Sequence, residues 1–234
     1  MEIVVVSDLH VLCRRSRWRA HRDALDALAV DADLLVLNGD TFDFKWSDHA
    51  TEEGAVAEAV RFLRGILETF PRCRVHVNLG NHDHYAPYIE ALDALARRQP
   101  RLTWHPYFLR VGNTLFLHGD VAVGAVDPEQ LAVYRGKWLH KKRPHAFLGR
   151  VYDMAFRLRV HVLLPRLFFP TTRTLRRLHA YIYAIGHGAD TGLEHVYFGH
   201  THVPVRARRF RGLTFHNGGA PLPHIAFAPL RARV

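Results

Sequence analysis

Short apolar runs recur along the chain, and a cluster of polar residues follows each of them. The five runs are three to five residues long and consist mainly of Val, Leu, Ile and Phe: 3–6, 34–37, 75–79, 115–117 and 196–198. Apolar runs of this length that end in Gly or Asp are typical of strands buried inside a sheet. The pattern therefore predicts five buried strands, each leading into a polar loop.

The segments between the strands have helical spacing. Apolar residues recur there at every third or fourth position: Leu25 and Leu28; Val56, Val60, Leu63 and Leu67; Tyr88, Leu92 and Leu95. Strands that alternate with helices predict an α/β layered fold. Because ligands bind at the carboxyl ends of the strands in such sheets, the five polar clusters mark a candidate site.

The spacing of the clusters also locates an insertion. Successive clusters lie 32, 41 and 37 residues apart up to His118, but His200 follows His118 by 82 residues. We therefore expect a core formed by residues 1–126 and 191–234, with a helical cap inserted at 127–190. Within the cap, Val151, Ala155, Leu158 and Val162 have helical spacing, and Pro144, Pro165 and Pro170 are expected to divide it into two or three helices.

The composition is that of a globular protein. Of the 234 residues, 48% are hydrophobic and 23% are charged, and no apolar run is long enough to predict a membrane-spanning helix. Two cysteines exclude a disulfide scaffold and indicate a reducing compartment. An acid at Glu2, where a signal peptide would be basic, favours a cytoplasmic location.

The net charge of +10 is confined to the cap. Between Arg135 and Arg177 the sequence has twelve Lys and Arg but one acid, Asp153, so the rest of the chain is close to neutral. The same segment is rich in Leu and Phe. A basic and apolar helical segment is suited to an acyl chain or a membrane surface, which it would contact from the cytoplasmic side. The alternative is that its apolar residues pack the cap onto the core.

The polar clusters contain a set of metal-ligand residues without a thiolate. Mixed oxygen and imidazole ligands suit Mn, Fe or Zn. Seven ligands are too many for one ion with an open position but suit two ions that share a carboxylate. The residues are Asp8, His10, Asp40, Asn81, His118, His200 and His202.

These motifs resemble the calcineurin-like metallophosphoesterase superfamily. The resemblance covers residues 1–120 and 195–220 and rests on Asp8-Leu9-His10, Gly39-Asp40-x-x-Asp43, Gly80-Asn81-His82-Asp83, His118 and Gly199-His200-Thr201-His202. It implies an α/β fold, specifically a four-layer α/β/β/α sandwich, with a dinuclear metal site. It also implies hydrolysis of a phosphoester or pyrophosphate bond by a metal-bound hydroxide.

The resemblance assigns a role to each motif residue. Asp8, His10, Asp40 and His202 would hold one ion, and Asp40, Asn81, His118 and His200 the other, with Asp40 bridging. His82 would be the catalytic imidazole at the leaving group, and Asp83 the carboxylate that orients it. For Asp43, a role in supporting the site and a structural role remain open.

The substrate is suggested by a narrower resemblance. The stretch Asp40-Thr41-Phe42-Asp43-Phe44 with Trp46, together with the basic insert, looks like the UDP-2,3-diacylglucosamine pyrophosphatases of lipid A synthesis. This implies an anionic, lipid-linked nucleotide sugar as substrate and Mn as the metal. At His82 the best-known branch of that family carries arginine, so a paralogous branch stays open.

Three arginines, Arg14, Arg15 and Arg157, are candidates for binding the substrate phosphates. A phosphodiesterase or nuclease that acts on nucleic acid is the main alternative. It is less favoured because the aromatic residues of the cap lie within aliphatic runs and not between basic residues. A scaffold that has lost catalysis is a further alternative, although no ligand position is missing.

Overall fold

Two five-stranded sheets form the centre of the protein. The computed structural model describes residues 1–140 and 146–234. The first sheet has the order β10-β1-β2-β3-β4 and is parallel except for β10. Its strands are β10 (Leu230–Arg233), β1 (Glu2–Val6), β2 (Leu34–Asn38), β3 (Arg74–Asn78) and β4 (Leu102–His105).

The second sheet has the order β5-β6-β7-β9-β8. Its three inner strands are parallel, and both edge strands are antiparallel to their neighbours. The strands are β5 (Phe108–Val111), β6 (Thr114–Leu117), β7 (His195–Tyr197), β8 (Val205–Phe210) and β9 (Leu213–Asn217). The runs predicted as buried strands are thus confirmed as β1, β2, β3, β6 and β7.

The two sheets pack face to face because side chains alternate along each strand. In β1, Ile3 and Val5 point between the sheets, where they share a core with Phe116 of β6, whereas Val4 and Val6 face the helices on the other side. Two buried asparagines also join the sheets. Asn38 donates to the backbone oxygens of 117 and 197, and Asn78 donates to Asn38 and to the backbone oxygen of 116.

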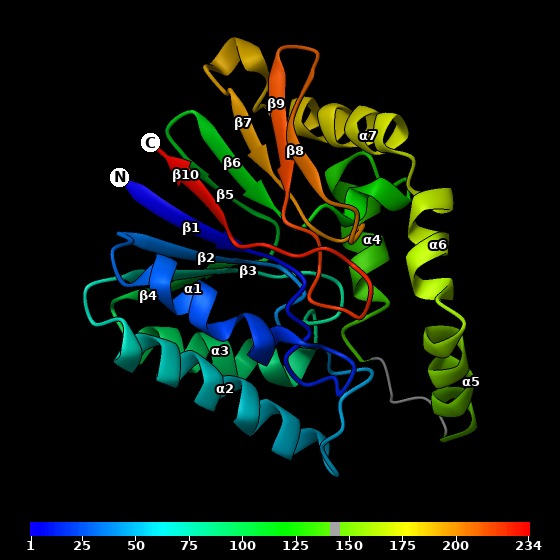
Figure 1. Cartoon of the computed structure of the whole chain (residues 1–234). Coiled ribbons are helices and arrows are strands. Elements are labelled where there is room, and N and C mark those ends of the chain that lie inside the picture. The colour runs from blue at the N-terminus through cyan, green and yellow to red at the C-terminus, as the bar shows by residue number, and fades with distance from the viewer. Residues whose placement is uncertain (141–145) are drawn as a thin grey trace.

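Helices cover the outer face of each sheet. Figure 1 shows α1 (Arg22–Ala29), α2 (Glu52–Thr69) and α3 (Ala86–Arg98) on the outer side of the first sheet. On the second sheet, α4 (Pro128–Gly136) contributes Leu131 and α7 (Thr171–Ala184) contributes Leu175 and Leu178 to the core. The predicted four-layer α/β/β/α sandwich is confirmed. The short 3₁₀ turns are η1 (Trp18–His21), η2 (Asp120–Val123) and η3 (Ala189–Thr191).

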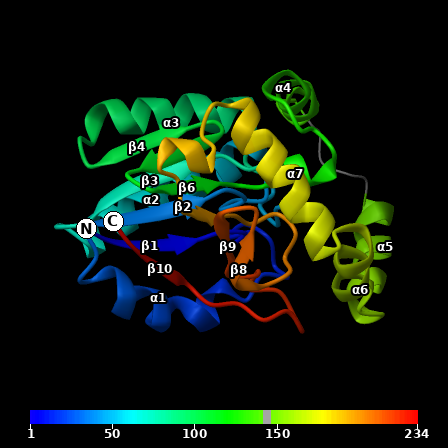
Figure 2. The same ribbon diagram turned by 90° about the horizontal axis from the view of Figure 1, so that it is seen from above.

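The segment 127–190, predicted as a helical cap, contains two different kinds of helix. Its first and last helices, α4 and α7, belong to the outer layer described above. The other two, α5 (Ala146–Arg157) and α6 (Val160–Phe168), lie outside the two-sheet core in both ribbon views (Figures 1 and 2). The name cap therefore refers below to α5 and α6 alone, in place of the whole segment 127–190. The limits of a separate domain stay a prediction.

The chain divides α5 from α6 at Arg159 and not at a proline. Arg159 has φ 57°, in the left-handed region, which ends α5. The expectation that Pro165 separates two helices is wrong, because Pro165 lies inside α6 and removes only one backbone donor from that short helix. Pro170 does precede a helix, as the residue before α7, whereas Pro144 lies outside the described residues.

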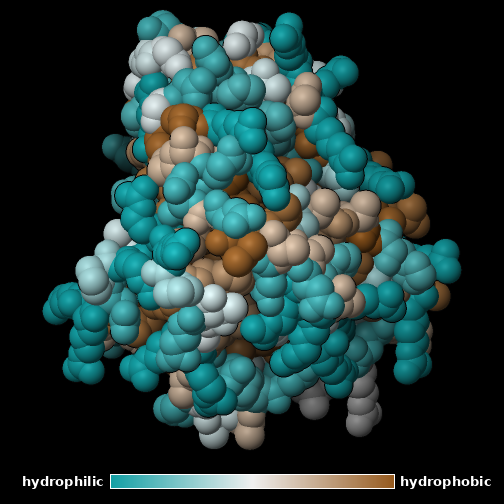
Figure 3. All heavy atoms as spheres, turned by 60° about the vertical axis from the view of Figure 1, so that its left-hand side comes forward, coloured by the Kyte–Doolittle hydropathy of each residue, from teal (hydrophilic) through white to brown (hydrophobic). Residues whose placement is uncertain are grey.

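The cap exposes large apolar side chains. They are Val151, Met154 and Leu158 on or next to α5, and Leu163, Leu164, Leu167 and Phe168 on α6. The face of the molecule in Figure 3 is mostly hydrophilic and shows its apolar side chains in smaller groups. Among the helices of the described ranges, none combines the length and hydropathy needed to cross a bilayer.

Candidate metal centre

Seven candidate ligands come from the ends of five strands. Parallel strands of one sheet end at the same edge, so loops distant in sequence meet there. Asp8 and His10 follow β1, Asp40 follows β2, Asn81 follows β3, His118 follows β6, and His200 and His202 follow β7. All are buried except His200 and His202, which are partly exposed.

The backbone is strained where several of these ligands lie. Asp8, His10, Asp40, His200 and His202 all have φ between 47° and 63°. Residues with a Cβ rarely adopt this left-handed conformation, which costs about 1–3 kcal/mol at each position and persists where the surrounding structure enforces it. The concentration of such strained residues at these loops indicates a functional site.

The glycines of the motifs leave room for the ligands. A Cβ on Gly80 would lie 2.1 Å from Asp40 Oδ1, and one on Gly199 would lie 2.3 Å from Asp8 Oδ2. A Cβ on Gly39 would lie 2.5 Å from the His118 ring. The Gly-Asp, Gly-Asn and Gly-His pairs of the sequence therefore have a steric reason, since any larger residue would push a ligand out of place.

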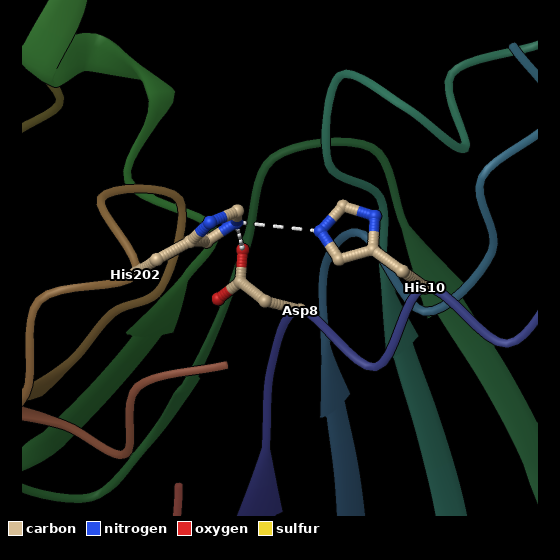
Figure 4. A group of neighbouring side chains, drawn as sticks. All are labelled: Asp8, His10 and His202. Carbon is tan, nitrogen blue, oxygen red and sulfur yellow. Dashed lines mark hydrogen bonds and ion pairs between the residues drawn. The ribbon is translucent and has the colours of Figure 1, made fainter. Parts of the chain in front are cut away.

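Asp8, His10 and His202 form the first group of ligands (Figure 4). His202 Nε2 lies 3.4 Å from Asp8 Oδ1 and 3.3 Å from His10 Nε2. Asp8 also accepts the backbone N–H of His200 at 2.9 Å, which connects the loops after β1 and β7. The three side chains point to a common centre from two sheets.

Asp40, His118 and His200 form the second group. His118 Nε2 lies 3.3 Å from Asp40 Oδ2, from His200 Nδ1 and from Asn81 Oδ1. Asp40 uses its other oxygen to accept the backbone N–H of His82 at 2.8 Å. The predicted ligands thus fall into two adjacent groups; a bridging role for Asp40 stays a prediction.

The distances fit divalent metal ions. Ligand atoms at about 2.1 Å from a tetrahedral ion lie about 3.4 Å from one another, which matches the 3.3–3.4 Å between these imidazole and carboxylate atoms. Oxygen and imidazole donors of this kind suit Mn, Fe and Zn.

Histidines and carboxylates in the two groups stabilise each other's charged forms. Burial alone would raise the pKa of Asp40, but His118 and His82 hold that pKa well below its usual range. Burial would lower the pKa of His118, yet Asp40 raises it to about 9. The centre therefore carries anionic carboxylates, which are the form that binds a cation.

His82 is oriented by Asp43. Asp43 Oδ1 lies 2.9 Å from His82 Nδ1, and Oδ2 lies 3.5 Å from His10 Nδ1. Burial opposes the charge on His82, but Asp43 and Asp40 raise the pKa of the imidazole to about 9. Asp43 contacts both His82 and a candidate ligand, and its Oδ1 also accepts the backbone N–H of Trp46 at 3.0 Å. The supporting role and the structural role of Asp43 therefore both stay predictions.

The expectation that Asp83 orients His82 is wrong. Asp83 is fully buried and accepts the backbone N–H groups of Gly80 at 2.5 Å and Thr41 at 2.9 Å. Its carboxylate therefore joins the loops after β2 and β3 beneath the site. The loop bends at Asn81, His82 and Asp83, and Asp83 turns back to the N–H of Gly80 while His82 faces Asp43.

The three predicted substrate-binding arginines lie near or on the cap. Arg14 and Arg15 both form ion pairs with Asp153 of α5, and the Arg15 guanidinium lies 4.4 Å above the Tyr152 ring. Arg157 is exposed at the end of α5. Asp153, the one acid of the basic segment 135–177, thus attaches the cap to the loop after β1. Contact of these arginines with substrate stays a prediction.

Sequence reasoning missed a group of residues beside His82. The Trp138 ring lies 4.9 Å from the His82 ring, and Lys45 lies between Trp46 and Trp138. Behind them, the buried Arg135 binds both oxygens of Asp120 at 2.8 and 3.0 Å. The signal in the sequence was the Lys-Trp pair at 45–46, directly after the Asp40 motif.

The comparison with sequence families identifies the family of the chain. The sequence model of a family described as calcineurin-like phosphoesterase matches residues 1–204. No curated protein matches the chain. One solved structure, of a dimetal phosphatase from Danio rerio, shares 12% identity over 98% of this chain and 91% of that chain, with a TM-score of 0.49. A likeness at that level carries no argument about function.

Proposed function

Because the chain belongs to the calcineurin-like phosphoesterase family and is a metal-dependent hydrolase, we propose that it hydrolyses the pyrophosphate bond of a nucleotide linked to an acylated sugar. UDP-2,3-diacylglucosamine is the substrate that the sequence resemblance suggests. The observation that carries this proposal is the position of the apolar cap beside the metal centre.

The candidate ligands would hold two divalent ions, and we propose Mn. Asp8, His10, Asp40 and His202 would hold one, and Asp40, Asn81, His118 and His200 the other, so that Asp40 is shared. When bound, such ions lower the pKa of water and stabilise negative charge on the phosphoryl group.

His82 would supply a proton to the leaving group, and Asp43 would orient the His82 ring. Asp43 contacts Nδ1 of His82, and we propose that Nε2 of the same ring faces the substrate. An imidazolium kept charged by a carboxylate can give a proton to the oxygen that leaves. Asp43 thereby fixes the ring and stabilises its charged form.

The cap touches the centre at its inner side. The ring of Phe169, which follows α6, lies 5.5 Å from the ring of His200. At the other end of the cap, Tyr152 of α5 stacks on Trp46 at 4.1 Å and 9°. A substrate bound at the metal centre would therefore meet the cap.

Exposed apolar side chains of the cap suit an acyl chain or a membrane surface. Leu167 is 70% exposed and Phe168 is 58% exposed, and the exposed Arg157, Arg159 and Arg166 are close to them in sequence. Apolar side chains combined with arginines complement an anionic amphiphile, which has acyl chains and negative phosphates. We therefore propose that the cap also contacts the membrane surface, which would place the enzyme at the cytoplasmic face.

Substrate hydrolysis tests the proposal. The Mn-loaded protein is incubated separately with UDP-2,3-diacylglucosamine and with single-stranded and double-stranded oligonucleotides. Release of UMP from the lipid substrate alone supports the proposal, whereas cleavage of oligonucleotides without UMP release contradicts it and favours a nuclease.

A pair of variants tests the cap. Leu163→Ser with Leu167→Ser should lower sedimentation with anionic phospholipid vesicles. The control, Val30→Ser with Val133→Ser, changes two residues that are exposed to a similar degree on other parts of the surface and should leave sedimentation unchanged. Equal binding by both double variants would contradict membrane contact through the cap.

A further inference from the structure

A cleft lies between α1 and α2 on the outer side of the first sheet. Figure 1 shows the two helices on that side, and the cleft between them has a volume of about 250 Å³. Its apolar lining consists of six side chains from η1, α1, α2, β2 and the end of α2: Trp18, Leu25, Leu35, Phe62, Ile66 and Phe70. Among the described residues that line the cleft, none is a candidate metal ligand.

Gly65 keeps part of the wall of this cleft open. It lies in the interior of α2, where glycine is about 1 kcal/mol less favourable than alanine. Outside the local helix backbone, a Cβ placed on Gly65 would meet no atom within 4 Å. Because Gly65 is one of the lining residues, a larger side chain at this position would narrow the cleft.

Five charged residues line the cleft, and four of them form two ion pairs. Arg22 Nε lies 3.2 Å from Asp26 Oδ2, and Arg61 Nη1 lies 2.6 Å from Glu58 Oε2. The fifth, Arg19, has no acidic partner within 4 Å in the part of the chain that the structure describes. The lining therefore carries one positive charge that no paired acid balances.

A smaller hollow next to the cleft leaves this charge in place. It shares Arg19 and Glu58 with the cleft and adds one arginine and one aspartate, Arg14 and Asp48. Arg14 Nε lies 4.0 Å from Asp48 Oδ1, so the added residues form a pair of their own. Together they contribute no net charge beside Arg19.

The ring of Trp18 positions the guanidinium of Arg19. The Arg19 Cζ lies 5.0 Å from the centroid of that ring, which is within the range of a cation–π contact. Trp18 in turn contacts Phe62 of α2 edge to face, at 5.2 Å and 86°. Arg19 is exposed whereas Leu35 is fully buried, so the charge lies at the opening of the cleft and the apolar surface lies inside it.

An apolar cleft with one cation at its opening complements a monoanion with an apolar body. The apolar body would be removed from water by the aromatic and aliphatic lining. A guanidinium presents a planar fork of N–H donors that matches a carboxylate. The volume is below the range of about 300–1,000 Å³ that is typical of sites for drug-sized ligands, so the ligand is a small one.

We propose that the cleft between α1 and α2 binds a small carboxylate with an apolar body. The carboxylate pairs with Arg19, and the apolar body lies against Trp18 and reaches toward Leu35. This site does not depend on the proposed function, because its lining residues take no part in the metal centre. It is a binding site, and no covalent bond forms or breaks there.

Calorimetric titration of the full chain with octanoate tests the site. Octanoate should bind saturably with one molecule per chain. Octanol has the same chain length without the charge and should bind at least about 10-fold more weakly, as expected for the loss of a charged hydrogen bond. Acetate has the charge without the chain and should show no saturable binding.

Two variants locate the ligand. Gly65→Leu should abolish the binding of octanoate and octanol, and it should unfold at the same or a higher urea concentration than the wild type, because leucine favours a helix over glycine. Arg19→Met should weaken octanoate binding by about 10- to 100-fold and change octanol binding by no more than about twofold. Arg19→Lys keeps the charge and should recover most of the affinity for octanoate.

Two matched variants serve as controls. Ala57→Leu adds bulk at an exposed position of α2 outside the cleft, and Arg98→Met removes an exposed arginine of α3; both should bind octanoate as the wild type does. Undiminished octanoate binding by Gly65→Leu would place the ligand elsewhere, for example on the cap, and would overturn the inference. Equal affinity for octanoate and octanol, or no saturable binding of octanoate to the wild type, would overturn it as well.

Discussion

Asp43 Oδ1 lies 2.9 Å from His82 Nδ1, although Asp83 is the acidic neighbour of His82 in the sequence. The two aspartates are both buried, but they face different partners. Asp43 faces imidazoles, whereas Asp83 faces backbone N–H groups. We therefore expect Asp43 to affect the orientation and protonation of His82, and Asp83 to stabilise the loops after β2 and β3.

Asp43→Asn is expected to lower kcat by roughly 10²-fold, because an amide cannot stabilise the charged imidazole or fix its orientation as a carboxylate does. Steady-state kinetics with a chromogenic phosphodiester measure the effect. A variant with full activity would show that Asp43 has no part in orienting His82.

Asp83→Asn is expected to destabilise the protein by about 1–3 kcal/mol. Its carboxylate accepts two backbone N–H groups in a buried position, and an amide would direct its own donors toward one of them. Urea unfolding followed by fluorescence gives the free energy. Equal stability of this variant and the wild type would contradict the structural role.

Metal binding and proton transfer should be separable. Asp40→Ala should retain less than one Mn per chain after desalting, because it removes a carboxylate from the centre. His82→Ala should keep the wild-type metal content and lose about 10²- to 10⁴-fold in turnover. Metal analysis and kinetics on the same samples test both; full activity in His82→Ala would exclude the imidazole as proton donor.

The buried Arg135–Asp120 pair should be costly to break. Arg135 is 1% exposed and binds both oxygens of Asp120. Arg135→Met leaves a buried carboxylate without its partner and should cost about 3–5 kcal/mol of the free energy of unfolding. The double variant with Asp120→Leu should lose less than the sum of the two single losses, and additive losses would contradict the pairing.

His76 should make stability depend on pH. Its ring lies between Thr103 Oγ1 at 2.8 Å and Asn78 Oδ1 at 3.2 Å, and burial lowers its pKa to about 4. The unfolded chain, with a pKa near the usual 6.5, binds the proton first as the pH falls. The stabilisation that buried, neutral His76 gives the folded state is therefore fully present above pH 6.5. It is lost as the pH falls toward 4.

The variant His76→Gln has no titratable side chain at position 76, so it cannot bind the proton that His76 binds on unfolding. Between pH 7 and pH 5 the wild type should lose about 2 kcal/mol more of its free energy of unfolding than the variant does. Urea unfolding at the two pH values gives the difference. Parallel losses in both proteins would show that His76 does not titrate as its burial predicts.

Local features of the sequence were sufficient for an α/β layered fold and for the candidate ligands, whereas the four-layer arrangement was implied by the family resemblance. Strands and helices follow from the periodicity of apolar residues, because a strand or helix must bury an apolar face. Asp, Asn and His residues directly after strands indicated the candidate ligands, because these residues coordinate metals, and at Asp40, Asn81 and His200 a preceding glycine leaves room for them. The apolar periodicity and the short motifs both involve residues that are close together in the sequence.

Other features depended on contacts between distant segments. Asp43 rather than Asp83 faces His82, Asp153 pairs with Arg14 and Arg15, and Lys45 meets Trp138 across 93 positions. Spacing along the chain cannot predict them, since they are set by how loops turn and how helices pack. The sequence by itself determined the α/β fold and the candidate metal ligands. The tertiary structure decided which carboxylate, cation and aromatic ring lie around His82, because only packing places side chains in three dimensions.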